Sequence, residues 1–286
     1  MTRLFFVILI LICRPVWADV DFTEIKKSAL LSAASYASAE VIEKRLVAGG
    51  YDLRQQQTLA DSGLSYFLAS SSTGHQYLSF RGTSNLENAL VDLDLALQLD
   101  ADLNIQLHQG FAGAAKMAYQ NVKAKLDKNK PISTTGHSLG GAIAVIVAMH
   151  LQRDGYQLEG VITFGQPKVT NVAGAEVFSA LPLMRIVTPK DIVPLVPPLS
   201  PLQLKNLDIY WHMGSEIILL ENKEYAQIKG IKSMMRATKF VSSVPDKTNL
   251  DAHQIATYLA LIEQKLVAAQ PVPYTLEINV FGFTLD

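Results

Sequence analysis

A serine set between glycines is the strongest chemical signal in the sequence. Residues 136–140 read Gly-His-Ser-Leu-Gly, a G-x-S-x-G pattern between the β-rich run 132–135 and the apolar helical pattern 142–151. A strand-to-helix turn of this kind strains the backbone of its serine and projects the hydroxyl from the top of a sheet. The flanking glycines leave room for the segments that pass each other. We therefore predict Ser138 as a nucleophile.

A serine nucleophile needs a histidine that takes its proton and a carboxylate that orients the histidine. Asp191 follows the predicted strand 184–188, and functional groups of parallel sheets gather at the carboxyl ends of strands. His253 is expected in a loop before a helix, whereas His150 lies on the helix after the serine and His212 in a predicted hairpin. We predict Asp191 and His253 as the partners of the serine, with His212 as the alternative base.

Acyl transfer also needs hydrogen-bond donors for the oxyanion of the tetrahedral intermediate. One donor is the main-chain N–H of the residue after the nucleophile, here Leu139. The other is expected from the loop after an early strand, where residues 77–83 end on Arg-Gly-Thr. Thr83 offers both its N–H and its hydroxyl, so we predict Leu139 and Thr83 as the oxyanion hole.

The elements that must hold these groups alternate between strand and helix. Apolar periodicity predicts strands at 64–70, 76–80, 132–135, 160–164 and 184–188 and helices near 25–37, 142–151, 173–181 and 254–266. A hairpin is predicted from 207–211 to 216–220, and an edge strand over 274–280. This alternation indicates an α/β fold with a mostly parallel sheet and helices on both faces. No linker divides the chain, so we predict one domain over 19–286.

Composition and charge exclude two classes of protein. The 286 residues are 49% hydrophobic and 18% charged, and 25 Lys and Arg face 26 Asp and Glu, for a formal charge of −1. The apolar content is enough for a core, which excludes a disordered chain. A nucleic-acid-binding protein is excluded as well, because there is no basic excess to neutralise phosphates.

Residues 1–18 have the pattern of a secretory signal peptide. Arg3 precedes an apolar run over 4–12, too short to cross a bilayer, and Val16 and Ala18 are small residues at the two positions that signal peptidase reads. We predict cleavage after Ala18 and export, either into the medium or into a periplasm. The only cysteine, Cys13, lies inside this segment, so the mature chain would have no disulfide, which favours a bacterial source.

Several motifs together resemble the fungal-type class 3 triacylglycerol lipases of the α/β-hydrolase superfamily. The resemblance runs in order from about residue 29 to 261 and rests on the segments 80–83, 108–111, 136–142, 164–169, 191–198 and 252–253. It implies an α/β-hydrolase fold with Ser138, Asp191 and His253 as the triad. It also implies Thr83 and Leu139 as the oxyanion hole, in agreement with the choice made from position and chemistry.

In that family a short helical lid follows the oxyanion loop. The residues Leu86, Leu90, Leu93 and Leu97 recur here at helical spacing with acidic residues between them. Such an amphipathic segment would cover the serine in water and turn its apolar face to a lipid surface, although an ordinary surface helix has the same pattern. Ala89 stands where the fungal lipases often have tryptophan, which argues against strong interfacial activation.

Two charged segments suggest other functions. Asp100, Asp102 and Asn104 begin like a calcium-binding loop, but Ile105 replaces its required glycine, so we predict no metal and no cofactor. Residues 222–247 carry six basic side chains, a pattern compatible with contact to an anionic membrane surface. A solvated loop and short helix is the preferred interpretation of that segment.

The sequence as a whole predicts an exported serine ester hydrolase of the lipase type, acting on acyl-glycerol esters through an acyl-enzyme. It does not fix the head group, so phospholipase, lysophospholipase and feruloyl-type carboxylesterase activities are alternatives. The rival from another class is a lipid-binding protein with a silent triad, although all five predicted positions carry competent residues. The predicted partners are the acyl-lipid substrate and, through the lid leucines, a membrane or lipid interface in transient contact, and the oligomeric state is left open.

Overall fold

The computed structural model describes residues 20–60, 62–83, 96–198, 208–238, 246–274, 278–280 and 283–285. The predicted signal peptide lies outside these residues, as do three of the four leucines of the predicted lid, Leu86, Leu90 and Leu93. Among the described residues, no helix has the length and apolar character needed to cross a membrane.

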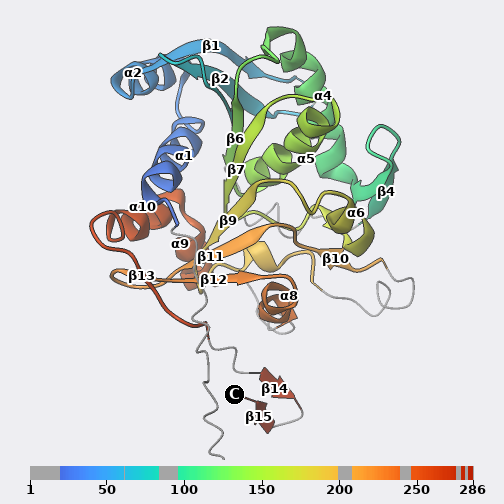
Figure 1. Ribbon diagram of the computed structural model, residues 1–286, viewed down its shortest axis with the longest axis vertical. Coiled ribbons are helices and arrows are strands. Elements are labelled where there is room, and N and C mark those ends of the chain that lie inside the picture. Colours follow the sequence, from blue (N-terminus) through green and yellow to red (C-terminus); the bar gives the residue numbers. More distant parts are fainter. Residues whose placement is uncertain are drawn as a thin grey trace, which may run out of the picture.

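A nine-stranded sheet forms the centre of the protein, in the order β1-β2-β3-β6-β7-β9-β11-β12-β13 (Figure 1). Its strands are β1 (Tyr51–Thr58), β2 (Ser65–Ser71), β3 (Gln76–Phe80), β6 (Ile132–His137), β7 (Leu158–Phe164), β9 (Leu183–Val187), β11 (Ser215–Leu219), β12 (Glu224–Lys229) and β13 (Gln270–Pro271). The neighbours from β3 to β11 are parallel, while β1, β2 and β12 join antiparallel. The predicted mostly parallel sheet is confirmed.

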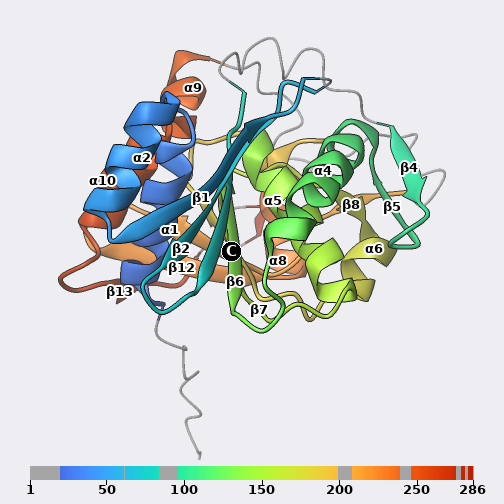
Figure 2. The ribbon, with the colours of Figure 1, turned by 90° about the horizontal axis from the view of Figure 1, so that it is seen from above.

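Helices cover both faces of this sheet, as predicted (Figures 1 and 2). One side carries α1 (Phe22–Ala34), α2 (Ala39–Ala48) and α10 (Ile255–Glu263), and the other carries α4 (Gln109–Val122), α5 (Leu139–Arg153) and α6 (Val172–Val177). The helix after the serine, α5, is buried from Gly140 to Leu151, because it packs between the sheet and α4. Its almost wholly apolar sequence fits that central position.

Shorter elements complete the fold. A second, four-stranded sheet has the order β10-β8-β5-β4. It consists of β4 (Leu97–Asp100), β5 (Ile105–His108), β8 (Thr170–Asn171) and β10 (Tyr210–Trp211). The remaining helices are α8 (Ile231–Thr238), α9 (Lys247–His253) and the 3-10 turns η1 (Lys123–Lys125) and η2 (Val193–Leu195).

Strand pairing differs from the prediction in three places. The predicted hairpin between 207–211 and 216–220 is wrong, because β10 pairs with β8 while β11 is held between β9 and β12 in the main sheet. Leu97 is not on a helix with the other lid leucines, since it opens β4 opposite His108. The strand expected over 274–280 is no edge of the main sheet: β14 (Ile278–Val280) pairs with β15 (Phe283–Leu285) in a separate hairpin.

A tight turn joins β6 to α5 at Ser138. The serine has φ 58° and ψ −132°, a backbone region that residues other than glycine rarely adopt. Its main-chain N–H donates to the carbonyl of Phe164 on β7 at 2.8 Å, which fixes the strained turn to the sheet. A Cβ added at Gly136 would lie 2.3 Å from the carbonyl oxygen of Gly140, and one added at Gly140 would lie 2.2 Å from that of Phe80. Only glycine permits this crossing of the chain.

These distances predict that Gly136→Ala destabilises the protein. Backbone cannot move aside as a flexible side chain can, so we expect the free energy of unfolding to fall by about 2 kcal/mol or more in urea denaturation. The matched control is Gly113→Ala on α4, where an added Cβ would meet nothing within 4 Å. There we expect a gain of about 0.5–1 kcal/mol from helix propensity. Equal effects of the two substitutions would contradict this account of the turn.

Candidate active site

The side chains of Asp191 and His253 are buried and lie against each other as a pair. The Nδ1 atom of His253 lies 2.8 Å from Oδ2 of Asp191, and the two residues are 3% and 0% exposed. Asp191 follows β9, as predicted, but His253 is the last residue of α9 rather than a loop residue. A capping box at Asp246 starts this short helix and so determines where His253 is presented.

Two further donors hold the carboxylate of Asp191. The hydroxyl of Tyr258, on α10, donates to Oδ2 at 2.5 Å, and the main-chain N–H of Val193 donates to Oδ1 at 2.9 Å. Burial alone would raise the pKa of Asp191, but the neighbouring His253 and these hydrogen bonds outweigh it and hold the pKa below its usual value. Asp191 therefore stays ionised. Tyr258 was not among the residues predicted from the sequence, because its place in an apolar helical pattern resembles that of any core tyrosine.

Ser138 lies at the same end of the sheet as this pair. The strand β7 that accepts the N–H of Ser138 continues into Gly165, where an added Cβ would lie 2.7 Å from both Asp191 Oδ2 and His253 Cε1. The Nε2 atom of His253 is buried and has no hydrogen-bond partner within the described part of the chain. In a Ser-His-Asp triad this atom takes the proton of the serine during the attack. The structure thus pairs Asp191 with His253 and places Ser138 at the same end of the sheet.

The predicted oxyanion loop passes directly over the serine. A Cβ added at Gly82 would lie 3.0 Å from the Cβ of Ser138, so the next residue, Thr83, is also close to the nucleophile. Leu139 is the first residue of α5, and its N–H belongs to the unpaired donors at the start of a helix. The two positions proposed for the oxyanion hole therefore flank Ser138 from separate segments of chain.

His137, next to the nucleophile, is fully enclosed and hydrogen-bonded on both sides. Its Nδ1 lies 2.8 Å from the hydroxyl of Tyr36 and its Nε2 lies 2.6 Å from the carbonyl oxygen of His253. A carbonyl only accepts, so Nε2 carries the hydrogen and Nδ1 accepts from the tyrosine. Burial, and after it the proximity of His253, lowers the pKa of His137 to about 3. The residue is therefore neutral.

His212, the alternative base, has a different place. Its Nε2 donates to the carbonyl of Pro194 at 2.6 Å, on the loop that follows Asp191. Lys168 contacts the same loop, since its buried ammonium donates to the carbonyls of Leu195 and Pro197. Burial lowers the pKa of Lys168 to about 7. His212 thus holds the loop after the acid, and the carboxylate pairs with His253 instead.

The basic segment 222–247 is only partly at the surface. Arg236 is 4% exposed and forms a buried ion pair with Glu216, which also accepts from Arg185 at 3.2 Å. The membrane-facing interpretation is therefore wrong for Arg236, whose charge is needed to neutralise a buried carboxylate. Lys229 and Lys232 are exposed.

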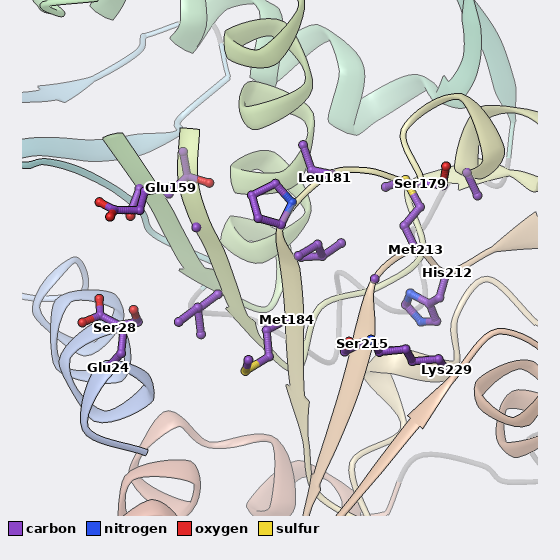
Figure 3. A pocket seen from close by; sticks show the side chains of 18 of the residues that line it. Glu24, Ser28, Glu159, Ser179, Leu181, Met184, His212, Met213, Ser215 and Lys229 are labelled. Atoms are coloured by element: carbon purple, nitrogen blue, oxygen red, sulfur yellow. The ribbon is translucent and has the colours of Figure 1, made fainter. Parts of the chain in front are cut away.

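A cavity of about 980 Å³ lies at the other end of the sheet, near the amino ends of β6, β7 and β9 (Figure 3). One end of the cavity holds a second serine–histidine–carboxylate set: His75 Nε2 lies 2.9 Å from Ser133 Oγ, and its Nδ1 lies 3.0 Å from Glu159. Ser133 is inside β6, between Tyr77 of β3 and Gly160 of β7. Extended backbone of this kind has no turn that exposes the hydroxyl beside free N–H donors, so we assign no catalysis to Ser133.

The acidic cluster considered for calcium is engaged by protein groups. Asp102 pairs with Lys116 at 2.7 Å, and Asp100 accepts from the main-chain N–H of Asp102 and Leu103. Within the ranges that the structure describes, no group of three or more His, Cys, Asp or Glu side chains is arranged to hold a metal ion.

The chain is similar to known lipases in sequence and in fold. A family model described as "Lipase (class 3)" matches residues 77–200. That range contains Thr83, Ser138, Leu139 and Asp191, while His253 lies beyond it. A lipase of Rhizomucor miehei is 31% identical over 148 residues, which cover 47% of this chain and 41% of that protein. A secreted mono- and diacylglycerol lipase of Fusarium solani is 31% identical over 139 residues, 43% of this chain and 39% of that protein.

The fold is also similar to that of a solved lipase structure. The crystal structure of a lipase from Rhizopus microsporus var. chinensis superposes with a TM-score of 0.59 at 26% identity, over 69% of this chain and 74% of that one. In sequence, the chain matches about two fifths of the length of the Rhizomucor miehei and Fusarium solani relatives. These relatives are fungal, so they lend no support to the bacterial source expected from the sequence.

The neutral state of His137 predicts a dependence of stability on pH. The unfolded chain takes up a proton on this residue near the ordinary pKa of 6.5, but the folded chain does so only near 3. Stability is therefore full above about 6.5 and falls as the pH drops toward 3, by up to about 1.4 kcal/mol per pH unit. We measure the free energy of unfolding by urea denaturation at pH 6 and pH 4. In His137→Gln we expect it to change less between these two pH values, because about one proton fewer is taken up on unfolding. An unchanged difference between the two pH values would contradict the buried neutral state.

Proposed function

We propose that the chain is a member of the class 3 lipase family and a serine hydrolase of acylglycerol esters, because the class 3 lipase model matches residues 77–200. The observation that carries the proposal is the buried Asp191–His253 pair at the same end of the sheet as the strained turn of Ser138, with His253 Nε2 unbonded within the described residues. Strain is retained at such a turn where the surrounding structure imposes it, and it is common at active sites. The named relatives are lipases, which supports an acyl-lipid substrate.

The proposed reaction begins with attack of Ser138 Oγ on the ester carbonyl. His253 Nε2 takes the proton of the hydroxyl, and Asp191 holds the Nδ1–H tautomer and stabilises the imidazolium that forms. The N–H groups of Thr83 and Leu139, with the hydroxyl of Thr83, stabilise the oxyanion. His253 then donates the proton to the leaving alcohol, and an acyl-enzyme remains on Ser138.

Water completes the proposed cycle. His253 takes a proton from the water as it attacks the acyl-enzyme, and returns that proton to Ser138 as the fatty acid leaves. The apolar sequence of residues 195–198, which follow Asp191, supports a hydrophobic acyl chain.

We also propose that the protein is exported and that residues 19–286 form its mature domain. The support is the signal-peptide pattern of residues 1–18 and the name of the Fusarium solani relative, which is secreted. We retain the hypothesis that Leu86, Leu90 and Leu93 belong to a lid that meets the lipid interface. Leu97, in β4, is removed from that lid.

The direct test is hydrolysis by the mature protein of a panel of acyl substrates. The panel contains p-nitrophenyl esters of short and long chains, mono-, di- and triacylglycerol, phosphatidylcholine, its lyso form and a feruloyl ester. We expect activity on acylglycerols to fall at least about 10³-fold in Ser138→Ala, since the covalent step is lost. Preferred cleavage of phosphatidylcholine or of the feruloyl ester would replace the lipase assignment by one of those activities.

Ser133→Ala is the matched control, because Ser133 also contacts a histidine but lies at the other end of the sheet. We expect its activity to remain within about twofold of the unmodified protein, since the substitution leaves the reacting groups in place. A mature protein that binds lipid vesicles but hydrolyses no member of the panel would overturn the proposal in favour of a lipid-binding protein with a silent triad.

A further inference from the structure

The hydroxyl of Tyr36 lies where three segments of the candidate site meet. Tyr36 follows α1, far from the other site residues in the sequence. Its oxygen accepts the main-chain N–H of Gly82 and lies 2.8 Å from Nδ1 of His137. His137 in turn reaches the carbonyl of His253 at 2.6 Å. A single chain of hydrogen bonds thus connects the oxyanion loop, the turn of the nucleophile and the catalytic base.

The donor and the acceptor of every hydrogen bond in this series are determined. The carbonyl of His253 only accepts, so His137 donates from Nε2 and accepts at Nδ1. The one hydrogen of the Tyr36 hydroxyl must then point to Nδ1, which leaves its oxygen free to accept from Gly82. The low pKa of His137 fits this arrangement, since a protonated ring would have no acceptor for the tyrosine.

Each connected atom belongs to a proposed reacting residue or to its direct neighbour. Gly82 precedes Thr83, His137 precedes Ser138, and the carbonyl is that of His253 itself. The fit is close: a Cβ added at Gly82 would lie 2.3 Å from the Tyr36 hydroxyl and 2.5 Å from the carbonyl of His137. The loop therefore has little room to move toward the serine, and a movement away from the tyrosine would break the bond between Gly82 and Tyr36.

We propose that Tyr36 is a positioning residue, which sets the oxyanion loop and the base relative to Ser138 through His137. This inference rests on the proposed hydrolase function. Tyr36 itself touches no reacting atom in this account. Oxyanion donors act only when they lie at hydrogen-bond distance from the developing charge, and a displacement of about 1 Å costs about 10²-fold in rate. The hydroxyl is therefore needed mainly in the transition state.

The test compares Tyr36→Phe with Tyr66→Phe. The control also removes a tyrosine hydroxyl: Tyr66 lies in β2, and its partly buried hydroxyl donates to Asn121 of α4 at 2.5 Å. We expect Tyr36→Phe to lower kcat on the best substrate of the panel by about 10- to 100-fold and to leave KM within about twofold. Tyr66→Phe should keep kcat within about twofold, and both variants are compared at equal fractions folded, checked by thermal unfolding. A kcat of Tyr36→Phe within twofold of the unmodified protein would overturn the proposal.

A second measurement tests the hydrogen-bond network of Tyr36 and His137 without any substrate. In ¹⁵N spectra of the imidazole rings at pH 7, we expect His137 as the neutral Nε2–H tautomer in the unmodified protein and in Tyr66→Phe, and a changed Nδ1 shift in Tyr36→Phe. The Nδ1–H tautomer or a charged ring in the unmodified protein would refute the network. If the unmodified protein hydrolyses nothing, the proposed function fails while these spectra still decide whether Tyr36 holds His137 and Gly82 as described. In that case the positioning role in catalysis fails with it.

Discussion

Ser138 keeps its strained backbone because β6, α5 and the end of β3 pass one another at distances that exclude any Cβ. The carbonyl oxygens of Phe80 and Gly140 occupy the space that side chains at Gly140 and Gly136 would need. The strain costs about 1–3 kcal/mol, and the buried helix α5 and the bond from Ser138 to β7 offset it. The candidate site depends on this crossing, since it sets the serine at the carboxyl end of the sheet before any partner is considered.

Buried polar groups then fix the segments that surround the turn. Asp191 accepts from a histidine, a tyrosine and a main-chain N–H, so its charge is compensated without solvent. Lys168 and His212 hold the carbonyls of the loop that follows it. These groups serve one purpose: they replace water as hydrogen-bond partners, so that a loop of irregular backbone keeps its place beside the reacting atoms.

The features that could be predicted from the sequence are those determined by a local pattern or by the order of the elements along the chain. The turn at Ser138 has a short motif with its own backbone requirement, and Asp191 stands at a strand end. Contacts between distant segments leave no such trace: Tyr36 and Tyr258 look like ordinary aromatic residues in helical segments. Arg236 was read as a surface charge because nothing local reveals its partner Glu216. The predicted hairpin at 207–220 is wrong for the same reason. The strand β11 pairs in parallel with β9, which is not its neighbour in the sequence.

We propose that Ser138 is the reactive serine and that His253 activates it. The most direct test of this proposal is treatment of the mature protein with a long-chain p-nitrophenyl alkylphosphonate, followed by peptide mass spectrometry. This reagent traps a serine that attacks as in the first step of ester hydrolysis, because the phosphonate resembles the tetrahedral intermediate. We expect a single adduct on Ser138, formed much more slowly in His253→Ala. An adduct on Ser133, or none on Ser138, would contradict it.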